Sequence, residues 1–416
     1  MWILYNIGIY LGEVLVFIIA PFNQRVQKWR NGRKGLFQLI DNKIDSSKLH
    51  TWFHFASLGE FEQGRTVLEA YRENFPEKLI VVTFFSPSGY EVRANYAKAD
   101  HVFYLPADTP GNAKKFIDLI NPEEVFFVKY EFWHNYLKQL HRRNIPLYLV
   151  SAIFRKNQPF FKWYGSFFRS TLFYVKHFFV QNQESTILLK DIGINAVTLT
   201  GDTRFDRVAH LSLKKRNIDV ISKFVADHKI LVAGSTWLPD EELLMAWRQV
   251  YPEWKLIIAP HTIDVVHLKE VDNRFKDSVR FSALNAGANI AHKEEPYVLI
   301  IDNIGMLSYL YGYADIAYIG GGFGVGIHNI LEAATYGVPV IFGPVYHKFQ
   351  EAKDLISAKA AFSVHDLQEF VAVFEKFQDE HARQIAGERA FGYVQQQAGA
   401  TKKIIDYLIE RKTNTI

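Results

Sequence analysis

The chain of 416 residues is long enough for two domains, because a single hydrophobic core seldom serves more than about 250–300 residues. Hydrophobic residues make up 49% of the chain and charged residues 22%, which is a globular composition and argues against a disordered protein. The absence of cysteine excludes disulfides, thiolate metal sites and cysteine nucleophiles.

The net charge of +4 is concentrated in one short segment. Five basic residues and no acid lie between positions 25 and 34: Arg25, Lys28, Arg30, Arg33 and Lys34. A nucleic-acid-binding protein would spread its basic residues over a groove. We therefore expect no nucleic-acid partner, and we relate this cluster to the apolar segment that precedes it.

Residues 1–22 form that apolar segment, in which Asn6 and Glu13 are the only strongly polar side chains. About twenty apolar residues can span a bilayer. A secretory signal would carry its basic residues before the apolar run, whereas here they follow it, so we expect a retained membrane anchor with everything beyond Arg25 in the cytoplasm. A buried amphipathic helix is the alternative, favoured by Glu13, whose burial at mid-bilayer would cost roughly 2.5–3.5 kcal/mol.

Apolar runs alternate with amphipathic stretches from residue 49 onward, which predicts parallel βαβ units. Seven strands are expected in the first half, at 49–56, 78–85, 101–106, 123–130, 146–152, 177–182 and 196–201. A charged stretch at 214–219 interrupts the pattern, which then restarts with strands at 229–235, 255–260, 279–284, 297–302, 315–322 and 339–344. Helices are expected from residue 367 to the end.

These elements predict an α/β protein with two doubly wound Rossmann-like domains facing a cleft. The expected division is a membrane anchor and basic segment at 1–35, a first domain at 36–213, and a second domain with terminal helices at 214–416. A terminal helix of such a protein can also cross back to the first domain. Ligands of open parallel sheets bind beyond the carboxyl ends of the strands, so candidate residues are sought there.

Two acids of the first domain stand at such strand ends. Glu60 follows Ser57-Leu58-Gly59 after the first strand, and Glu131 ends the fourth strand in Lys129-Tyr130-Glu131. A carboxylate in the first turn of a helix is stabilised by the helix dipole. Glu60 can therefore be a plain first-turn residue, as can Glu62, and Glu131 can be a solvated turn residue. The turn at 86–89, Ser-Pro-Ser-Gly, offers amides and hydroxyls but is also ordinary turn chemistry.

The second domain carries polar and glycine-rich strand ends. Gly234-Ser235-Thr236, Pro260-His261-Thr262 and the run Gly320 to Gly324 each follow an expected strand. The glycine run is expected to lead into a helix beginning near residue 327, whose amino end could hold a phosphate. That helix would place His328 and Glu332 on one face, with Asn329 beside them, although His328 could also be a core or capping histidine.

Several nucleotide and metal motifs are excluded. No Gly-Lys dipeptide occurs, so there is no P-loop, and residues 320–326 do not fit G-x-G-x-x-G in any register. A metal site at His328 is not expected, because no Asp or second His stands at ligand spacing.

Taken in order, these motifs resemble one family, the 3-deoxy-D-manno-octulosonic acid (Kdo) transferases of lipopolysaccharide assembly. The matching pieces are SLGE at 57–60, TFFSPSG at 83–89, YEFW at 130–133, GDTRFD at 201–206, AGST at 233–236, IIAPH at 257–261, GGFG at 321–324 and HNILEAA at 328–334. Each piece alone is weak, but their order together with the apolar amino terminus is specific, and the resemblance covers nearly the whole chain.

The resemblance implies an inverting glycosyltransferase of the B-type fold that moves Kdo from CMP-Kdo to a lipid A precursor at the cytoplasmic side of the inner membrane. Glu60 would be the general base and Glu131 a second active-site acid. No metal cofactor is implied. The expected CMP-sugar-binding residues are Arg204, Ser235, Thr236, Pro260, His261, Gly321, Gly322, Gly324, His328, Asn329 and Glu332. The expected acceptor-binding residues are Ser57, Gly59, Ser86, Ser88 and Gly89.

The chain departs from the family pattern after the fourth strand and in the donor loop. Lys129 stands where the family usually has a Glu, which would change the grip on an anionic acceptor, and His134 stands where the family usually has a Pro. The donor loop Pro260-His261-Thr262 lacks the usual Arg, so another cation must meet the donor phosphate, and Arg204 is the candidate.

Two other functions are compatible with the sequence. One is a B-type transferase that uses a UDP-sugar on a lipid-linked or peptidoglycan intermediate, and the other is a non-catalytic nucleotide-binding module tethered to the membrane. Paired acids at strand ends argue against the second.

Overall fold

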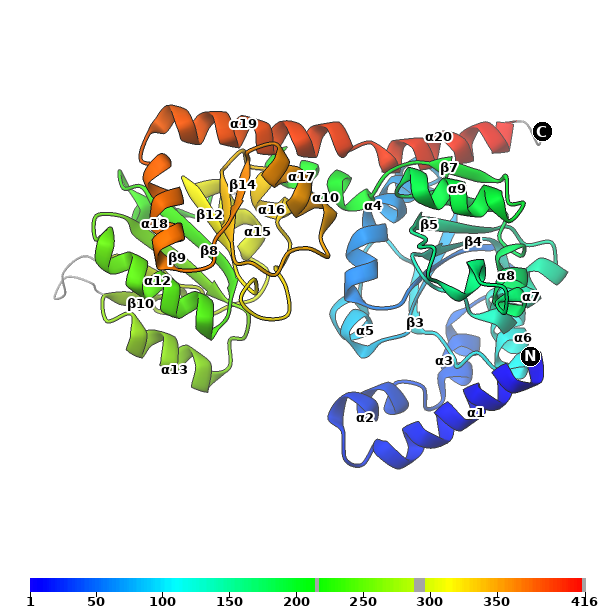
Figure 1. The fold of residues 1–416 in the computed structure, drawn as a ribbon. Helices are drawn as coiled ribbons and strands as arrows, with labels where there is room; N and C mark the ends of the chain where they lie inside the picture. The colour runs from blue at the N-terminus through cyan, green and yellow to red at the C-terminus, as the bar shows by residue number, and fades with distance from the viewer. Residues whose placement is uncertain (214–216, 288–295, 414–416) are drawn as a thin grey trace. The chain divides into compact units, whose positions relative to one another are not determined.

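A computed structural model describes residues 1–213, 217–287 and 296–413. The chain divides into two compact units, one formed by residues 1–207 and 398–416 and the other by residues 208–397 (Figure 1). The observed division at 207/208 lies close to the predicted boundary at 213/214, although residues 214–216 are outside the described part. The last helix was placed in the second domain, with crossing back to the first as the alternative, and the structure shows that it belongs to the first unit.

The first unit holds a seven-stranded parallel sheet in the order β3-β2-β1-β4-β5-β6-β7. Its strands are β1 (His50–Phe55), β2 (Leu79–Phe84), β3 (His101–Tyr104), β4 (Pro122–Val128), β5 (Leu147–Ala152), β6 (His177–Val180) and β7 (Val197–Leu199). All seven were predicted. The helices between them are α4 (Leu58–Asn74), α5 (Pro87–Arg93), α6 (Pro110–Ile120), α7 (His134–Arg142), α8 (Ser166–Leu172) and α9 (Gln183–Asp191), with η1 (Pro159–Phe161) and then α10 (Thr203–Leu213).

The second unit also holds a seven-stranded parallel sheet, with the order β10-β11-β9-β8-β12-β13-β14. Its strands are β8 (Ile230–Thr236), β9 (Lys255–Pro260), β10 (Ser278–Arg280), β11 (Val298–Ile300), β12 (Ile316–Ile319), β13 (Val340–Phe342) and β14 (Ala361–Ser363). The strand predicted at 279–284 stops at Arg280, and the rest is helix α14 (Phe281–Asn285). β14 was not predicted, because three residues give too little alternation to detect.

Helices α11 (Asp219–Val225), α12 (Leu238–Val250), α13 (Val265–Arg274), α15 (Leu307–Leu310), η2 (Tyr311–Tyr313), α16 (Leu331–Ala334) and α17 (Gln350–Ser357) connect these strands. The predicted helical end of the chain is confirmed as α18 (Leu367–Lys376), α19 (Glu380–Gln397) and α20 (Ala400–Thr413). α20 joins the first unit because Ile404, Ile405 and Leu408 pack with α4 and β1 in one hydrophobic cluster.

The amino-terminal segment forms α1 (Trp2–Ile19), α2 (Gln24–Asn31) and α3 (Leu36–Lys43). Within α1 only Asn6 is buried, and the helix is long and apolar enough to cross a membrane. Figure 1 shows its first turn beside α6, α7 and α8 of the same unit. There the Tyr5 hydroxyl donates to Asp108 Oδ2 at 2.6 Å, and Asn135 Nδ2 donates to Asn6 Oδ1 at 2.9 Å. The apolar helix is therefore fastened to its domain by a polar contact at one end.

Arg33 of the basic cluster has a structural role that the sequence did not reveal. Its guanidinium donates to the backbone carbonyls of Leu105 at 2.9 Å and Phe85 at 2.8 Å, and stacks 3.7 Å from the ring centre of Trp29. Burial lowers the pKa of Arg33 to about 9. Arg33 thus joins the amino-terminal helices to the sheet edge, and its guanidinium is partly buried there instead of being a free surface charge like the rest of a solvated cluster.

Candidate active site

The first sheet reverses its strand order between β1 and β4, and this switch point is where open parallel sheets bind ligands. Glu60 follows β1 and Glu131 follows β4. The two strands are neighbours, with Trp52 paired to Val125. The fold therefore brings both predicted acids to the same edge of the sheet, although 71 residues of sequence separate them.

Glu60 lies in the first turn of α4, with 23% of its side chain exposed. Ser57 caps this helix, since its Oγ accepts the Gly59 amide at 3.2 Å, and its hydroxyl donates to Glu60 Oε2. The Lys129 ammonium lies 4.0 Å from Glu60 Oε1. Glu60 is thus held by one hydroxyl and lies near one cation in the first turn of a helix, and its side chain still reaches solvent.

Glu62, only two residues away, has a different environment. It pairs with the guanidinium groups of Arg93 at 2.6 Å and Arg207 at 3.2 Å. These ion pairs join α4 to α5 and α10, so Glu62 has a structural role. The sequence had allowed such a role for either Glu60 or Glu62.

Glu131 is anchored more firmly than a solvated turn residue would be, with 11% of its side chain exposed. Its Oε2 accepts the Trp133 indole N–H at 2.6 Å and lies 3.2 Å from His54 Nε2. His54 is fully buried on β1. Sequence reasoning missed His54, and the available signal was a polar residue in the middle of an apolar strand.

Lys129 directly follows β4 and has a φ of 66°, the left-handed conformation that costs a side-chain-bearing residue about 1–2 kcal/mol. This turn directs the chain so that its ammonium approaches Glu60. The residue where this chain departs from the family pattern is therefore a neighbour of the predicted base.

The predicted acceptor residues after β2 have structural roles of their own. Ser86 caps α5, since its Oγ accepts the Ser88 amide at 3.3 Å, and the two hydroxyls are 3.0 Å apart. A Cβ at Gly89 would lie 2.3 Å from the Phe84 ring, so this glycine permits close packing. Ser86 and Ser88 remain at the strand ends where an acceptor could contact them.

Arg204 belongs to the first unit, at the start of α10. Its Nε donates to Asp202 Oδ2 at 2.8 Å, and its amide donates to Asp202 Oδ1 at 2.9 Å. Gln63 of α4 donates to the same carboxylate at 2.9 Å. Asp202 thus orients Arg204, and its contact with a donor phosphate stays a prediction.

The second sheet has its switch point between β8 and β12. Ser235, near the end of β8, has a φ of 55°, and the register with β9 shifts between Gly234 and Thr236. Such a bulge re-aims the side chains at a strand end. The Thr236 carbonyl then accepts the His261 amide at 2.9 Å, which brings Pro260 and His261 beside the end of β8.

Three rings stack at this edge. Trp237 and His261 have ring centres 4.5 Å apart, His261 and His328 have theirs 4.4 Å apart, and the Trp237 indole N–H donates to His328 Nε2 at 3.2 Å. Burial lowers the pKa of His261, and burial together with the neighbouring His261 lowers the pKa of His328. Both imidazoles are therefore favoured as neutral rings near pH 7. Trp237 was not predicted as a site residue.

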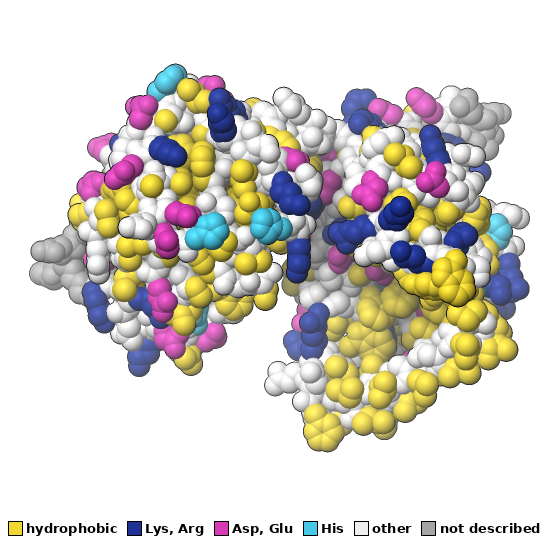
Figure 2. Space-filling model, in the orientation of Figure 1, with side chains coloured by type: hydrophobic (Ala, Val, Ile, Leu, Met, Phe, Trp, Pro, Cys, Tyr) yellow, Lys and Arg dark blue, Asp and Glu magenta, His cyan; other side chains and the backbone are white. Residues whose placement is uncertain are grey.

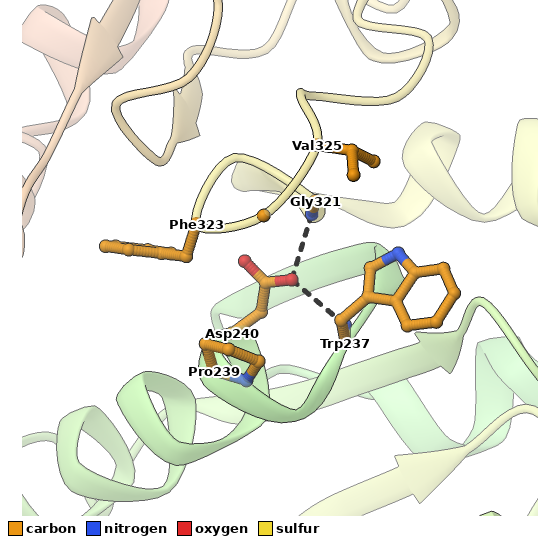
Figure 3. Close-up of a pocket in the computed structure, with 7 residues that line it drawn as sticks. Trp237, Pro239, Asp240, Gly321, Phe323 and Val325 are labelled. Carbon is orange, nitrogen blue, oxygen red and sulfur yellow. Dashed lines mark hydrogen bonds between the residues drawn. The ribbon is translucent and has the colours of Figure 1, made fainter.

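A pocket of about 260 Å³ lies beside Trp237. Figure 3 shows the residues that line it. Its lining residues are Trp237, Pro239, Asp240, Gly321, Phe323, Gly324 and Val325. The buried Asp240 carboxylate accepts the amides of Gly321 and Trp237, both at 2.9 Å, and the Tyr318 hydroxyl at 2.7 Å. Burial raises the pKa of Asp240, and these three donors oppose the rise.

The glycine run is built differently from the predicted phosphate-binding turn. The Gly321 amide is taken by Asp240, and the Gly324 amide donates to the Gly321 carbonyl at 3.0 Å. A Cβ at Gly322 would lie 2.6 Å from the backbone of Gly343. These glycines let the loop pass close to β13, so their binding of CMP stays a prediction while their packing role is observed.

The helix predicted to begin near residue 327 is wrong in its start and length, since α16 spans only Leu331–Ala334. His328 and Asn329 precede it, because the His328 amide donates to the Gly320 carbonyl at 3.2 Å instead of continuing a helix. His328 and Glu332 therefore do not share a helix face. The predicted phosphate site at the amino end of that helix is also wrong, because no helix begins near residue 327. Asn329 Nδ2 donates to Glu332 Oε1 at 3.0 Å, so these two residues do lie together.

Among the described residues, no three His, Cys, Asp or Glu side chains cluster in a way that could hold a metal ion.

Residues 23–207 match the family model described as 3-deoxy-D-manno-octulosonic-acid transferase (kdotransferase). A 3-deoxy-D-manno-octulosonic acid transferase of Aquifex aeolicus is 30% identical over 337 residues, which cover 77% of this chain and 83% of that protein. The chain belongs to the Kdo transferase family. It is thus a glycosyltransferase of lipopolysaccharide biosynthesis. The Haemophilus influenzae Kdo transferase is 24% identical over 371 residues, covering 86% of each chain.

A longer relative from Fusobacterium nucleatum, a bifunctional glycosyltransferase/methyltransferase, is 25% identical to this Kdo transferase over 395 residues. The alignment covers 91% of this chain but only 59% of the relative.

Solved structures confirm the fold. A UDP-GlcNAc 2-epimerase from Neisseria meningitidis has a TM-score of 0.60 at 16% identity, covering 87% of this chain and all of the other. A putative UDP-N-acetylglucosamine 2-epimerase from Listeria monocytogenes has a TM-score of 0.59 at 13% identity, covering 89% and 98%. The predicted pair of doubly wound parallel-sheet domains, the glycosyltransferase B-type architecture, is confirmed.

Proposed function

We propose that this Kdo transferase moves Kdo from CMP-Kdo to a lipid A precursor of the lipid IVA type, with inversion at the anomeric carbon and with Glu60 as general base. The single observation that carries the proposal is the setting of Glu60. Its carboxylate lies in the first turn of a helix capped by Ser57, is partly exposed, and stands at the switch point of the sheet in the region that matches the family model. The neighbouring Glu62, in contrast, forms ion pairs with two arginines.

In this mechanism Glu60 accepts the proton of the acceptor hydroxyl as that oxygen attacks the anomeric carbon of Kdo. The bond to CMP breaks, and its electrons leave with the phosphate. Ser57 holds one oxygen of Glu60 by its hydroxyl, which leaves Oε1 to face the acceptor. The Lys129 ammonium, 4.0 Å from Oε1, would attract the negatively charged acceptor.

The donor would bind at the switch point of the second unit. The neutral imidazoles of His261 and His328, stacked with Trp237, offer a flat surface for a nucleobase and ring N–H groups for a phosphate. Asn329 and Glu332 would hold the ribose hydroxyls, and Arg204 would meet the donor charge. CMP leaves with a single phosphate that these groups could share, so we propose that no metal cofactor is required.

We further propose that the chain works at the cytoplasmic face of the inner membrane, where the lipid acceptor resides. Support comes from the exposed apolar face of α1, which includes Leu11 (57% exposed) and Leu15 (55%). Figure 2 shows hydrophobic side chains gathered over this part of the first unit. Trp163 (92% exposed) and Tyr164 (56%), just before α8, add aromatic side chains of the kind enriched at membrane interfaces.

The contacts of the first turn of α1 indicate that this helix is held against the first unit. Tyr5 of α1 packs against Phe167 of α8, with ring centres 5.9 Å apart and the rings tilted by 47°, so α1 contacts the helix that follows the Trp163 segment. Burial raises the pKa of Asp108, the partner of Tyr5, to about 7. Deleting residues 1–22 would therefore also uncover a buried carboxyl group, and substitutions on the apolar face test anchoring more cleanly.

The deciding experiment supplies the full-length protein with CMP-Kdo and tetraacylated lipid A precursor and resolves the products by mass. We expect a product heavier by one or more Kdo units, and no product with a panel of UDP-sugars. Transfer from a UDP-sugar but not from CMP-Kdo would contradict the donor assignment and favour a different B-type transferase. CMP binding without any transfer would favour a non-catalytic nucleotide-binding module.

A further inference from the structure

A row of hydrogen bonds crosses the first sheet and ends at Glu131. The Trp52 indole N–H donates to Thr83 Oγ1 at 2.8 Å, Thr83 Oγ1 lies 2.8 Å from His54 Nδ1, and His54 Nε2 lies 3.2 Å from Glu131 Oε2. Trp52, His54 and Thr83 are fully buried, and His54 pairs with Thr83 in the register of β1 and β2. None of these three residues is explained by the proposed base or by the donor site.

The chemistry of the donors sets the direction of this row. An indole N–H can only donate, so Thr83 Oγ1 accepts from Trp52 and keeps its own proton for another partner. His54 Nδ1 is the acceptor within reach among the described residues. If Nδ1 accepts, the proton of a neutral imidazole is on Nε2 and is donated to Glu131.

The opposite placement of the His54 proton, on Nδ1, leaves fewer of the hydrogen-bonding groups with a partner. With the imidazole proton on Nδ1, Thr83 would receive two donors, and its hydroxyl proton would have no recorded partner in the described part of the chain. The tautomer with its proton on Nε2 fits all of the contacts.

We propose that Trp52, Thr83 and His54 are positioning residues that hold Glu131 as a fixed hydrogen-bond acceptor for a hydroxyl of the acceptor sugar. Glu131 already receives two N–H groups on Oε2, from His54 and Trp133, which fix the orientation of its carboxyl group. Its second oxygen orients the acceptor while Glu60 takes the proton. This inference rests on the proposed function.

A matched pair of substitutions tests the row. Thr83→Ser keeps the hydroxyl and loses a methyl group, whereas Thr83→Val keeps the shape and loses the hydroxyl. We expect Thr83→Val to lower kcat/KM for the lipid acceptor about tenfold, which is the worth of one hydrogen bond. We expect Thr83→Ser to stay within about twofold of wild type, and CMP affinity to be unchanged in both. Equal activity of the two variants, whether normal or reduced, would overturn the proposal.

Nitrogen chemical shifts of His54 give a readout that needs no catalysis. The full-length chain labelled on histidine is compared with His54→Gln to assign the signal. A protonated Nε2 and an unprotonated Nδ1 support the row, and the reverse pattern overturns it. A wild-type chain that shows this pattern but transfers no Kdo would refute the proposed function and not the hydrogen-bond row, so the two failures are distinguishable.

Discussion

Each unit has a seven-stranded parallel sheet whose strand order reverses beside its first strand, but the residues at the two switch points carry different kinds of chemistry. The first unit presents charged groups, with Glu60, Lys129 and Glu131 at the ends of β1 and β4. The second presents neutral rings, with His261 and His328 stacked beside Trp237 at the ends of β8, β9 and β12. One fold can therefore supply proton transfer at one edge and recognition of a flat nucleotide at another, because the loops after the strands are free to differ.

The largest effect is expected at the charged edge. Glu60→Gln keeps the shape of the side chain but cannot accept a proton, so turnover should fall roughly 10²–10⁴-fold with CMP affinity nearly unchanged. Turnover, CMP titration and melting temperature on the purified variant provide the measurement.

Glu62→Gln is the matched control for that variant. Because Glu62 forms ion pairs with Arg93 and Arg207, the loss of its charge should lower the melting temperature and leave turnover near normal. A folded, CMP-binding Glu60→Gln protein with near wild-type turnover would remove the proposed base, and Glu131 would be the next carboxylate to test.

The proposed membrane contact belongs to the first unit, on α1. Leu11→Asp together with Leu15→Asp places two charges on the exposed face of α1, each costing about 2.5–3.5 kcal/mol if the helix enters a bilayer. We expect most of the protein to leave the membrane fraction on sedimentation. Gln396→Asp, an exposed change in the second unit, should have no effect. Unchanged sedimentation of the double variant would contradict anchoring by α1.

A smaller effect is expected at the neutral edge. Glu332→Ala should weaken CMP binding by about 1–3 kcal/mol, the range for hydrogen bonds to a charged group, and titration calorimetry measures this directly. Glu369→Ala, which removes an exposed acid of α18, serves as the control. Equal CMP affinities for both variants would take Glu332 out of the nucleotide site.

The smallest effect concerns the ring stack itself. Trp237→Phe keeps an aromatic ring beside His261 but removes the N–H that reaches His328 Nε2. CMP affinity should fall by about 1 kcal/mol, the typical worth of one hydrogen bond. A Trp237→Ala variant, which also loses the ring, should bind more weakly than Trp237→Phe. If both variants bind CMP as wild type does, the stack has no part in donor binding.

Local pattern was enough to predict the alternation of strands and helices, and with it the two parallel sheets. Apolar runs such as 78–85 and 255–260 are short, buried and β-branched, so they are visible in the sequence without any tertiary information. The position of Glu60 after a strand and at a helix start was visible for the same reason. The predicted helix beginning near residue 327 was wrong because the His328 amide donates to the Gly320 carbonyl across the glycine loop, a contact that local pattern does not reveal.

By itself the sequence determined the fold class, the apolar amino terminus and the set of strand-end residues, since these depend on composition and short-range periodicity. Only the tertiary structure decided which of those residues can contact a ligand and which are engaged in contacts within the protein. Pairing with arginines separates Glu62 from Glu60, Asp240 occupies the Gly321 amide, and backbone carbonyls remove Arg33 from the surface charges. The physical reason is that availability depends on which groups meet across the fold, and contacts between distant segments leave no periodic signal in the sequence.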